Sequence, residues 1–225
     1  MKLNILQVGA FEVNCAIVET GERIFVIDPG GEAGRIIDFL SRAELTPDAI
    51  LLTHAHFDHI GAIPAMQARW PSLAVYVHPE DAKVLTHPLN VYPPDYPAIP
   101  RPDNLRDCRE LAEAEVIETP GHTPGGVCYH FRADNTLFSG DTLFAGSIGR
   151  TDLPGGDMAT LMKSLERLTK LPEATRVIPG HGRETTIAAE KRGNPFLTCS
   201  TAPGPGGRSG RPCARSLPTS PSSSP

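Results

Sequence analysis

The sequence predicts one α/β domain, and three observations support that prediction. Short apolar runs bounded by turn residues recur along the chain, as β-strands do. Longer segments with apolar residues at spacings of three and four separate several of these runs, which is typical of amphipathic helices packed on a sheet. At 225 residues the chain can bury a substantial core but has little room for a second domain.

The predicted elements alternate along most of the chain. Strands are expected at residues 3–8, 14–19, 23–28, 49–53, 73–77, 115–119, 126–131, 135–139 and 176–179. The clearest helices are expected at 32–42 and 158–169, where the apolar residues fall on one face. Shorter helices are expected at 61–69 and 80–86. Helices alone do not account for such a pattern, so the fold class is α/β.

Three segments depart from this alternation. Pro88 to Pro102 is rich in proline and predicts a stiff extended loop, either a plain surface connection or a wall of a substrate cleft. Gly140 to Gly156 is rich in glycine but lacks a phosphate-binding motif. The tail from Thr198 to Pro225 consists mostly of Pro, Ser, Gly, Thr and Ala, and its low hydrophobicity predicts disorder. The folded domain is therefore expected over residues 1–197 and a disordered tail over 198–225.

Composition narrows the classes of partner and compartment. The net charge of −5 disfavours general nucleic-acid binding and favours a small-molecule substrate. No segment approaches the ~20 apolar residues that cross a bilayer, and the N-terminus lacks the apolar core of a signal peptide, so we expect no membrane partner. The five cysteines form no closely spaced pairs, which argues against a disulfide framework and fits a reducing cytoplasm. The oligomeric state is left open.

The segment His54-Ala55-His56-Phe57-Asp58-His59 is the most informative part of the chain. It offers four metal-binding side chains directly after the apolar run at 49–52. On an extended segment side chains two apart share a face, so His54, His56 and Asp58 are expected to converge while His59 points elsewhere. This layout predicts two adjacent metals. Imidazoles and a carboxylate suit zinc, iron or manganese.

Three more candidate ligands follow strand-like runs further along the chain. They are His122, Asp141 and His181, and each has glycine or proline beside it, which marks a tight turn at a strand end. Rigid loops at strand ends are where functional sites usually lie. A single loop histidine is more often simply solvated, but together with the first cluster these residues complete a set of seven candidate ligands.

With these motifs the chain resembles the metallo-β-lactamase superfamily and, within it, short single-domain members of the glyoxalase II-like hydroxyacylglutathione hydrolases. The resemblance runs from about Leu3 to Leu197. Besides the candidate ligands it includes Asn14-Cys15, Asp28-Pro29-Gly30-Gly31, Thr53 and Gly149-Arg150-Thr151-Asp152. It implies a four-layer αββα sandwich with the site at one edge between two sheets. It also implies one metal held by His54, His56 and His122, another held by Asp58, His59 and His181, and Asp141 bridging them.

The resemblance implies a binuclear metallohydrolase that cleaves a thioester, such as S-lactoylglutathione or a related hydroxyacylglutathione. The cofactors would be two divalent ions, with zinc expected first and iron or manganese also suitable. Metals that share Asp141 could share a water and lower its pKa, so that hydroxide becomes the nucleophile. A thiolate, whose conjugate acid has a pKa of about 8.5, leaves without a strong general acid. Asp58 is a candidate catalytic residue, although ligation is its expected main role.

Substrate contacts are less well defined by the sequence. Arg150 is the cation expected near the substrate, because a cationic residue at the matching point of glyoxalase II-like enzymes helps bind glutathione; a loop salt bridge with Asp152 is the alternative. The chain lacks the C-terminal helical domain with which longer glyoxalase II enzymes grip glutathione. A mononuclear-iron persulfide dioxygenase is the main alternative activity, and a β-lactamase or a ribonuclease is a weaker one.

Overall fold

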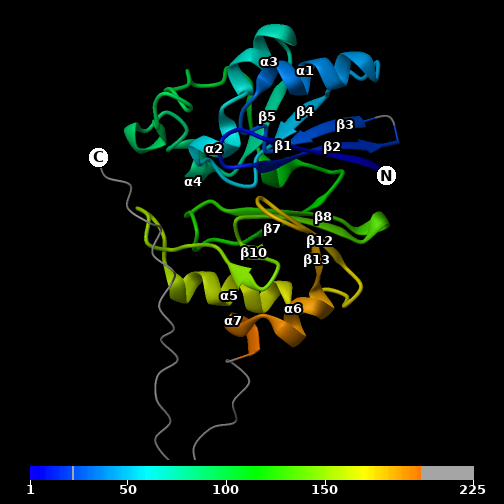
Figure 1. The fold of residues 1–225 in the computed structure, drawn as a ribbon, viewed down its shortest axis with the longest axis vertical. Helices are drawn as coiled ribbons and strands as arrows, with labels where there is room; N and C mark the ends of the chain where they lie inside the picture. The colour runs from blue at the N-terminus through cyan, green and yellow to red at the C-terminus, as the bar shows by residue number, and fades with distance from the viewer. Residues whose placement is uncertain (22, 199–225) are drawn as a thin grey trace, which may run out of the picture.

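The computed structural model, in which residues 1–21 and 23–198 are described, has four layers: helices, two facing β-sheets, and helices again (Figure 1). This confirms the predicted αββα sandwich. Most of the predicted tail, residues 199–225, lies outside the described residues, and its first residue, Thr198, ends the last helix.

The first sheet is built from the N-terminal half of the chain. Its strands, in spatial order, are β1 (Lys2–Val8), β2 (Val13–Thr20), β3 (Arg23–Ile27), β4 (Ala49–Leu51), β5 (Ala74–Val77) and β6 (Leu105–Asp107). The pairs β1/β2 and β2/β3 are antiparallel, and β3 to β6 run parallel. Its helices are α1 (Ala33–Arg42), α2 (Phe57–Ile60), α3 (Ile63–Arg69) and α4 (Pro79–Ala82). In Figure 1, α1 and α3 cover the outer face of this sheet.

The second sheet and its helices come from the C-terminal half. The strands, in spatial order, are β13 (Thr185–Thr186), β12 (Arg176–Pro179), β9 (Thr136–Gly140), β8 (Val127–Phe131) and β7 (Glu115–Glu118). A separate hairpin pairs β10 (Leu143–Phe144) with β11 (Ser147–Ile148). The helices are α5 (Met158–Leu168), α6 (Ile187–Gly193) and α7 (Pro195–Thr198). Short 3₁₀ turns lie at η1 (Pro88–Asn90), η2 (Cys108–Glu110) and η3 (Arg132–Asp134).

Three apolar clusters fill the spaces between these four layers. A sheet that is buried on both faces needs consecutive apolar residues, because neighbouring side chains on a strand point to opposite faces. In β3, Phe25 packs between the sheets and Val26 packs toward α1 and α3. Ile36 and Leu40 of α1 join the outer cluster of the first sheet. Leu161, Leu165 and Leu168 of α5 form the matching cluster on the second sheet. The helical spacing in the sequence therefore corresponds to a buried face.

Several elements differ from the sequence prediction. The strands β6, β10, β11 and β13 and the helices α6 and α7 were not predicted, because the strands are only two or three residues long and carry little periodic signal. The predicted helix at 80–86 is shorter and begins earlier, at Pro79. The proline-rich loop is not extended throughout, since it contains η1 and a bridge between Tyr92 and Tyr96.

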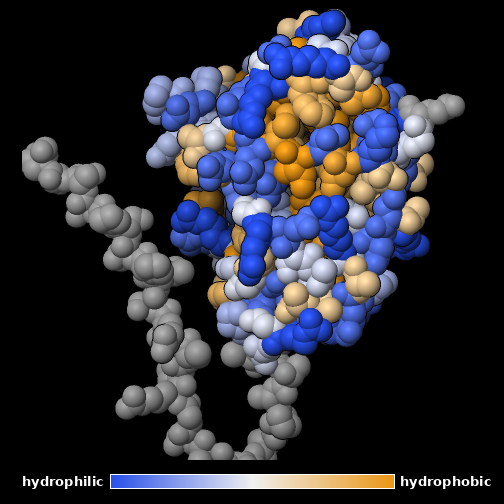
Figure 2. All heavy atoms as spheres, turned by 45° about the vertical axis from the view of Figure 1, so that its right-hand side comes forward, coloured by the Kyte–Doolittle hydropathy of each residue, from blue (hydrophilic) through white to orange (hydrophobic). Residues whose placement is uncertain are grey.

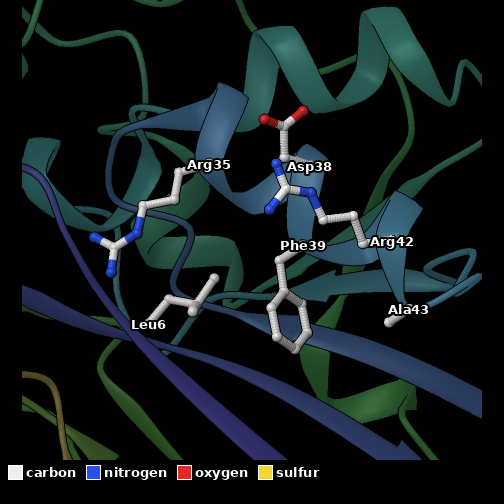
Figure 3. Close-up of a pocket in the computed structure, with 6 residues that line it drawn as sticks. All are labelled: Leu6, Arg35, Asp38, Phe39, Arg42 and Ala43. Atoms are coloured by element: carbon white, nitrogen blue, oxygen red, sulfur yellow. The ribbon is translucent and has the colours of Figure 1, made fainter.

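One face of the molecule carries a concentrated hydrophobic area surrounded by polar side chains (Figure 2). A hollow of about 630 Å³ lies between β1 and α1 and is lined by Leu6, Arg35, Asp38, Phe39, Arg42 and Ala43 (Figure 3). Its described lining contains no histidine or cysteine and none of the seven candidate ligands. Among the described residues, no helix is both long and apolar enough to span a bilayer.

Candidate metal centre

The ends of four strands bring the candidate ligands to one edge of the sandwich. The chain leaves β4 toward His54, β7 toward His122, β9 toward Asp141 and β12 toward His181. The strands β9 and β12 are parallel neighbours, so the turns that follow them lie side by side. Asn14 of β2 joins this edge to the other sheet, because its amide donates to the backbone oxygens of Pro179 and Gly182 at 2.9 and 2.8 Å.

The local structure at residues 54–59 corrects the expectation of one extended segment. Residues up to His56 are irregular or extended, but α2 begins at Phe57. A helix turns successive side chains by far less than a strand does, so Asp58 and His59 no longer point to opposite sides. The prediction that His54 and His56 converge is confirmed, but the prediction that Asp58 joins them while His59 points elsewhere is wrong. Asp58 and His59 contribute to the same set.

The candidate ligands form two sets that adjoin one another. The first ligand group consists of His54, His56 and His122, and the second ligand group consists of Asp58, His59 and His181. In each group one ligand atom from every residue lies within 4.8 Å of the others. His54 also lies within that distance of His59 and Asp141, so the two groups share a boundary. Both groups have the spacing needed to surround a cation.

Asp141 lies between the two groups. Its Oδ2 is 3.6 Å from Nε2 of His122 in the first group and 3.6 Å from Nε2 of His181 in the second. Its Oδ1 is 3.5 Å from Nε2 of His59. A Cβ on Gly180 would collide with this carboxylate and with His59, so the approach of the β12 turn requires glycine there.

Hydrogen bonds at Nδ1 orient three of the imidazole rings. His122 Nδ1 donates to the backbone oxygen of Arg150 at 2.7 Å, and His181 Nδ1 donates to that of Phe11 at 2.8 Å. His54 Nδ1 lies 3.1 Å from the hydroxyl of Thr53, which uses its own proton to donate to Asp28. In each case the proton sits on Nδ1, so the Nε2 lone pair is free to bind a metal.

The buried atoms without a hydrogen-bond partner within the described part of the chain include four metal-binding atoms at this edge. They are Nε2 of His54, Nε2 of His59, Nε2 of His122 and Oδ1 of Asp141. Buried polar atoms are rarely left unpaired, because each costs about 1–3 kcal/mol. Three imidazole nitrogens and a carboxylate oxygen that converge without partners fit divalent metal ions of the zinc, iron or manganese kind.

Two buried carboxylates outside the ligand groups support them from different directions. Asp28 lies 3.0 Å from Nδ1 of His59 and accepts from the amide of Thr53 at 2.8 Å. Asp81 of α4 accepts from the amides of Ala55 and Gly125 at 2.9 and 2.7 Å, and so connects the loop of His54 and His56 to the loop of His122. Asp28 therefore contacts the second ligand group directly and reaches His54 of the first group through Thr53, whereas Asp81 holds the loops of the first group.

Charge and burial give the two ligand groups different protonation. Burial, together with the neighbouring histidines, lowers the pKa of His54 well below its usual value and that of His56 to about 4. Burial has the same tendency at His59 and His181, but nearby carboxylates outweigh it and raise both pKa values. Burial raises the pKa of Asp58 and Asp141, yet the surrounding histidines lower both overall. His54 and His56 are therefore neutral imidazoles near pH 7, whereas the second group combines histidines of raised pKa with an ionised carboxylate.

The structure places Arg150 in a salt bridge. Its Nε and Nη2 donate to the two carboxylate oxygens of Asp152 at 2.7 and 2.8 Å, and both side chains are exposed. This is the loop ion pair that the sequence offered as the alternative to substrate binding. The backbone of Arg150, by contrast, takes part in the site through His122.

Sequence reasoning missed two residues that hold the first ligand group in place. Asp81 is fully buried, and Asn90 of η1 donates to the backbone oxygens of Ala55 and Val84 at 2.5 and 2.7 Å. Neither has a metal-ligand spacing. The available signal was weak: Asp81 lies in a His-Pro-Glu-Asp turn directly after the apolar run of β5. The proline-rich loop that contains Asn90 thus contributes to the site at its beginning.

Comparison with known proteins agrees with this geometry. The family model of the metallo-beta-lactamase superfamily matches residues 8–181, which includes both ligand groups. The chain belongs to the metallo-beta-lactamase superfamily. One relative carries the name of a metal-dependent hydrolase: the chain is 40% identical over 207 residues to the probable metallo-hydrolase YqgX of Bacillus subtilis (strain 168), a match that covers 88% of this chain and 98% of that protein.

A second relative has a more specific name. The chain is 35% identical to the hydroxyacylglutathione hydrolase GloC of Haemophilus influenzae (strain ATCC 51907 / DSM 11121 / KW20 / Rd), over 88% of this chain and 98% of the relative. Both relatives are covered almost completely, so the resemblance extends over the whole folded domain and is not limited to the ligand motif.

Three solved structures with the same fold carry different names. TTHA1623 in a di-iron-bound form is 42% identical, with a TM-score of 0.79, over 86% of this chain and all of that chain. BLEG-1, called a B3 metallo-beta-lactamase, is 38% identical with a TM-score of 0.79, over 88% of this chain and all of that one. ETHE1 from Myxococcus xanthus is 28% identical with a TM-score of 0.68, over 88% and 85% of the two chains. These structures share one scaffold with this chain, and one of them holds two iron ions.

Proposed function

We propose that this superfamily member is a binuclear metallohydrolase that cleaves thioesters of the hydroxyacylglutathione type. The observation that carries the proposal is Asp141, whose carboxylate lies between the first and second ligand groups at matching distances of 3.6 Å from His122 and His181. The similarity to GloC over nearly its full length supports the thioester as the substrate class. Zinc is the first metal to test, and the di-iron form of TTHA1623 makes iron the second.

In this proposal the chain supplies the ligands of both metals. His54, His56 and His122 would hold one ion, Asp58, His59 and His181 the other, and Asp141 would contact both. When bound, two such ions supply Lewis acidity and a hydroxide nucleophile at neutral pH. The protein fixes the position of each imidazole through the contacts at Nδ1.

The residues around the two groups fit thioester hydrolysis in a further respect. Cleavage of a thioester releases a thiolate whose conjugate acid has a pKa of about 8.5, so no strong general acid is needed. Asp58 is the nearest carboxylate to His181, with Oδ2 3.3 Å from its Nε2. The positive surroundings that lower the pKa of Asp58 keep it ionised, which suits a ligand better than a proton donor.

A thiol-release assay tests the proposal directly. The purified protein is loaded with zinc, iron or manganese, its metal content is measured by elemental analysis, and S-lactoylglutathione is offered beside other thioesters. We expect two metals per chain and rapid thiol release from S-lactoylglutathione. One metal per chain, or thioester cleavage no faster than in a metal-free control, would contradict the proposal.

The same metal-loaded protein can be used to test two alternative activities found on this scaffold. ETHE1 is a neighbour that gives a persulfide dioxygenase with a single iron some support, and BLEG-1 does so for β-lactam hydrolysis. Oxygen uptake with glutathione persulfide measures the first activity and nitrocefin turnover the second. Rapid oxygen uptake with one iron per chain would reject the thioester hydrolase proposal in favour of the dioxygenase. Nitrocefin turnover that rivals thioester cleavage would reject it in favour of β-lactam hydrolysis.

A further inference from the structure

A hollow beside the metal centre lies between the β10–β11 hairpin and the turn that follows β12. Its volume is about 270 Å³, and it is lined by Phe144, Ala145, Ser147, His181, Gly182 and Arg183. His181 belongs both to this hollow and to the second ligand group, and its ring centroid lies 6.4 Å from that of Phe144. A molecule whose reacting carbon lies over the metal ligands could therefore extend into this hollow without a gap.

The hollow is too small and too open to enclose a whole small ligand, but it has room for part of one. Pockets that enclose a whole small ligand usually measure ~300–1,000 Å³. This hollow is slightly below that range and is open to solvent on one side. Phe144 and Ala145 offer it an apolar surface, and Arg183 offers the one formal positive charge among the described residues that line it.

The guanidinium of Arg183 is available for a ligand. It is exposed, and within the described part of the chain it has no hydrogen bond or ion pair. The adjacent carboxylate, that of Glu184, is already occupied, because Arg176 donates to it from Nε at 2.8 Å. Arg150 is in the opposite situation, since Asp152 holds it through both oxygens.

The backbone that carries Arg183 is fixed in place. Gly182 has a φ of 75°, a conformation that favours glycine, and its carbonyl oxygen accepts from Asn14 at 2.8 Å. His181 before it pairs with Val13 across the two sheets. The turn therefore holds the backbone of Arg183 at a fixed place beside the second ligand group, and only its side chain has to become ordered when it binds an anion.

We propose that Arg183 binds a carboxylate in the thiol half of the thioester substrate, with the aliphatic part of that half lying on Phe144 and Ala145. The inference rests on the proposed function and deepens it. An acyl group such as lactoyl has no charge, whereas a glutathione-type thiol carries its carboxylates at a distance from the sulfur. A guanidinium recognises a carboxylate through two parallel hydrogen bonds, so an exposed arginine at this position selects anionic thiols.

Kinetics with two matched substrates test the assignment on the metal-loaded protein. S-lactoylglutathione carries the carboxylates, and the lactoyl thioester of N-acetylcysteamine has the same acyl group but no charge. For Arg183→Ala we expect KM for S-lactoylglutathione to rise about tenfold with kcat unchanged, because a charge-assisted contact distant from the reacting bond is lost. KM for the uncharged thioester should stay the same. Arg183→Lys should keep part of the preference, and Arg183→Glu should weaken it further than alanine.

Two further variants separate this site from general charge effects. Arg106→Ala removes an exposed arginine on β6 of the other sheet and should leave both KM values unchanged. Arg150→Ala is measured in parallel, because the resemblance places substrate binding there. If the selective rise in KM occurs in Arg150→Ala and not in Arg183→Ala, or if Arg183→Ala affects both thioesters equally, the assignment of Arg183 is overturned.

Binding without turnover distinguishes failure of this inference from failure of the proposed function. Calorimetry with S-methylglutathione needs no hydrolysis, so it reports on the subsite even if the wild-type protein cleaves neither thioester. We expect about tenfold weaker binding to Arg183→Ala than to the wild type. Equal affinities, or no binding to the wild type, would overturn the subsite whatever the catalytic result.

Discussion

The two ligand groups lie side by side, yet the protein supports them in different ways. The first group contains only histidines, and Asp81 fixes the two loops that carry it through backbone amides. The second group mixes a carboxylate with histidines, and Asp28 contacts a ligand side chain, His59, directly. Asp81 therefore positions the loops of the first group without contacting a ligand, whereas Asp28 contacts His59 of the second group directly and His54 of the first group only through Thr53. A substitution can therefore be chosen that disturbs one ligand group and leaves every ligand of the other group in place.

Removal of the residue shared by both groups has the largest expected effect. In Asp141→Ala both groups lose a ligand, so we expect metal content to fall and turnover to drop more than ~100-fold, since changes to outer partners alone typically cost about 10–100-fold. Elemental analysis and thiol release measure the two effects. Asp141→Asn keeps the shape but not the charge and should bind less metal than the wild type. Unchanged metal content in Asp141→Ala would contradict the bridging position.

Loss of Asp81 should mainly affect the first group and the stability of the fold. Asp81→Ala leaves the buried amides of Ala55 and Gly125 without an acceptor, and we expect the free energy of unfolding to fall by about 2–4 kcal/mol. Chemical denaturation of the metal-free protein measures this loss.

The matched control for Asp81 is Asp48→Ala. Asp48 also accepts from a backbone amide, that of Ile24 at 2.7 Å, but it is exposed, so water can replace it and the loss should stay below ~1 kcal/mol. Equal losses in the two variants would show that Asp81 does not have the special structural role assigned to it.

Replacement of Asp28 should weaken the second group selectively. Asp28→Asn removes the negative charge near His59, while asparagine still tolerates the φ of 49° at this position. We expect metal affinity at the second group to fall about 10–100-fold, and affinity at the first group to change less. Titration with a competing chelator resolves the two affinities. An equal loss at both groups would mean that Asp28 supports the centre as a whole.

Acidification should release the two metals in separate steps. Protons compete with a metal for an imidazole below its pKa, and the pKa values of His59 and His181 are raised, whereas that of His56 is lowered to about 4. As the pH falls, the metal of the second group should therefore leave before that of the first group.

Metal content after equilibration at successive pH values measures this order. In His56→Ala the first group is broken, and the metal that remains should dissociate in the higher pH step. Release of both metals from the wild type in a single step, or earlier release from the first group, would contradict the charge difference between the groups.

Residue patterns predicted much of this molecule. The apolar runs located most of the longer strands, and the spacing of Leu161, Leu165 and Leu168 located α5, because burial of one helix face needs that period. The sequence also singled out all seven side chains that the structure brings to one edge. It failed at residues 54–59, where an extended segment was expected and α2 was found. Four residues of helix give too short a periodic signal to be distinguished from a strand.

The sequence by itself determined which side chains are available for metal and which segments are buried, because ligand chemistry and hydrophobic periodicity are local properties of the chain. The resemblance implied how the ligands divide into two groups with Asp141 between them, but only the tertiary structure decided that Asp28 and Asp81 support these groups. It also decided that Arg150 pairs with Asp152 while Arg183 has no partner among the described residues. Most of these contacts join residues that are distant in the chain. Local sequence patterns do not determine such contacts, because they form only when the two sheets pack together.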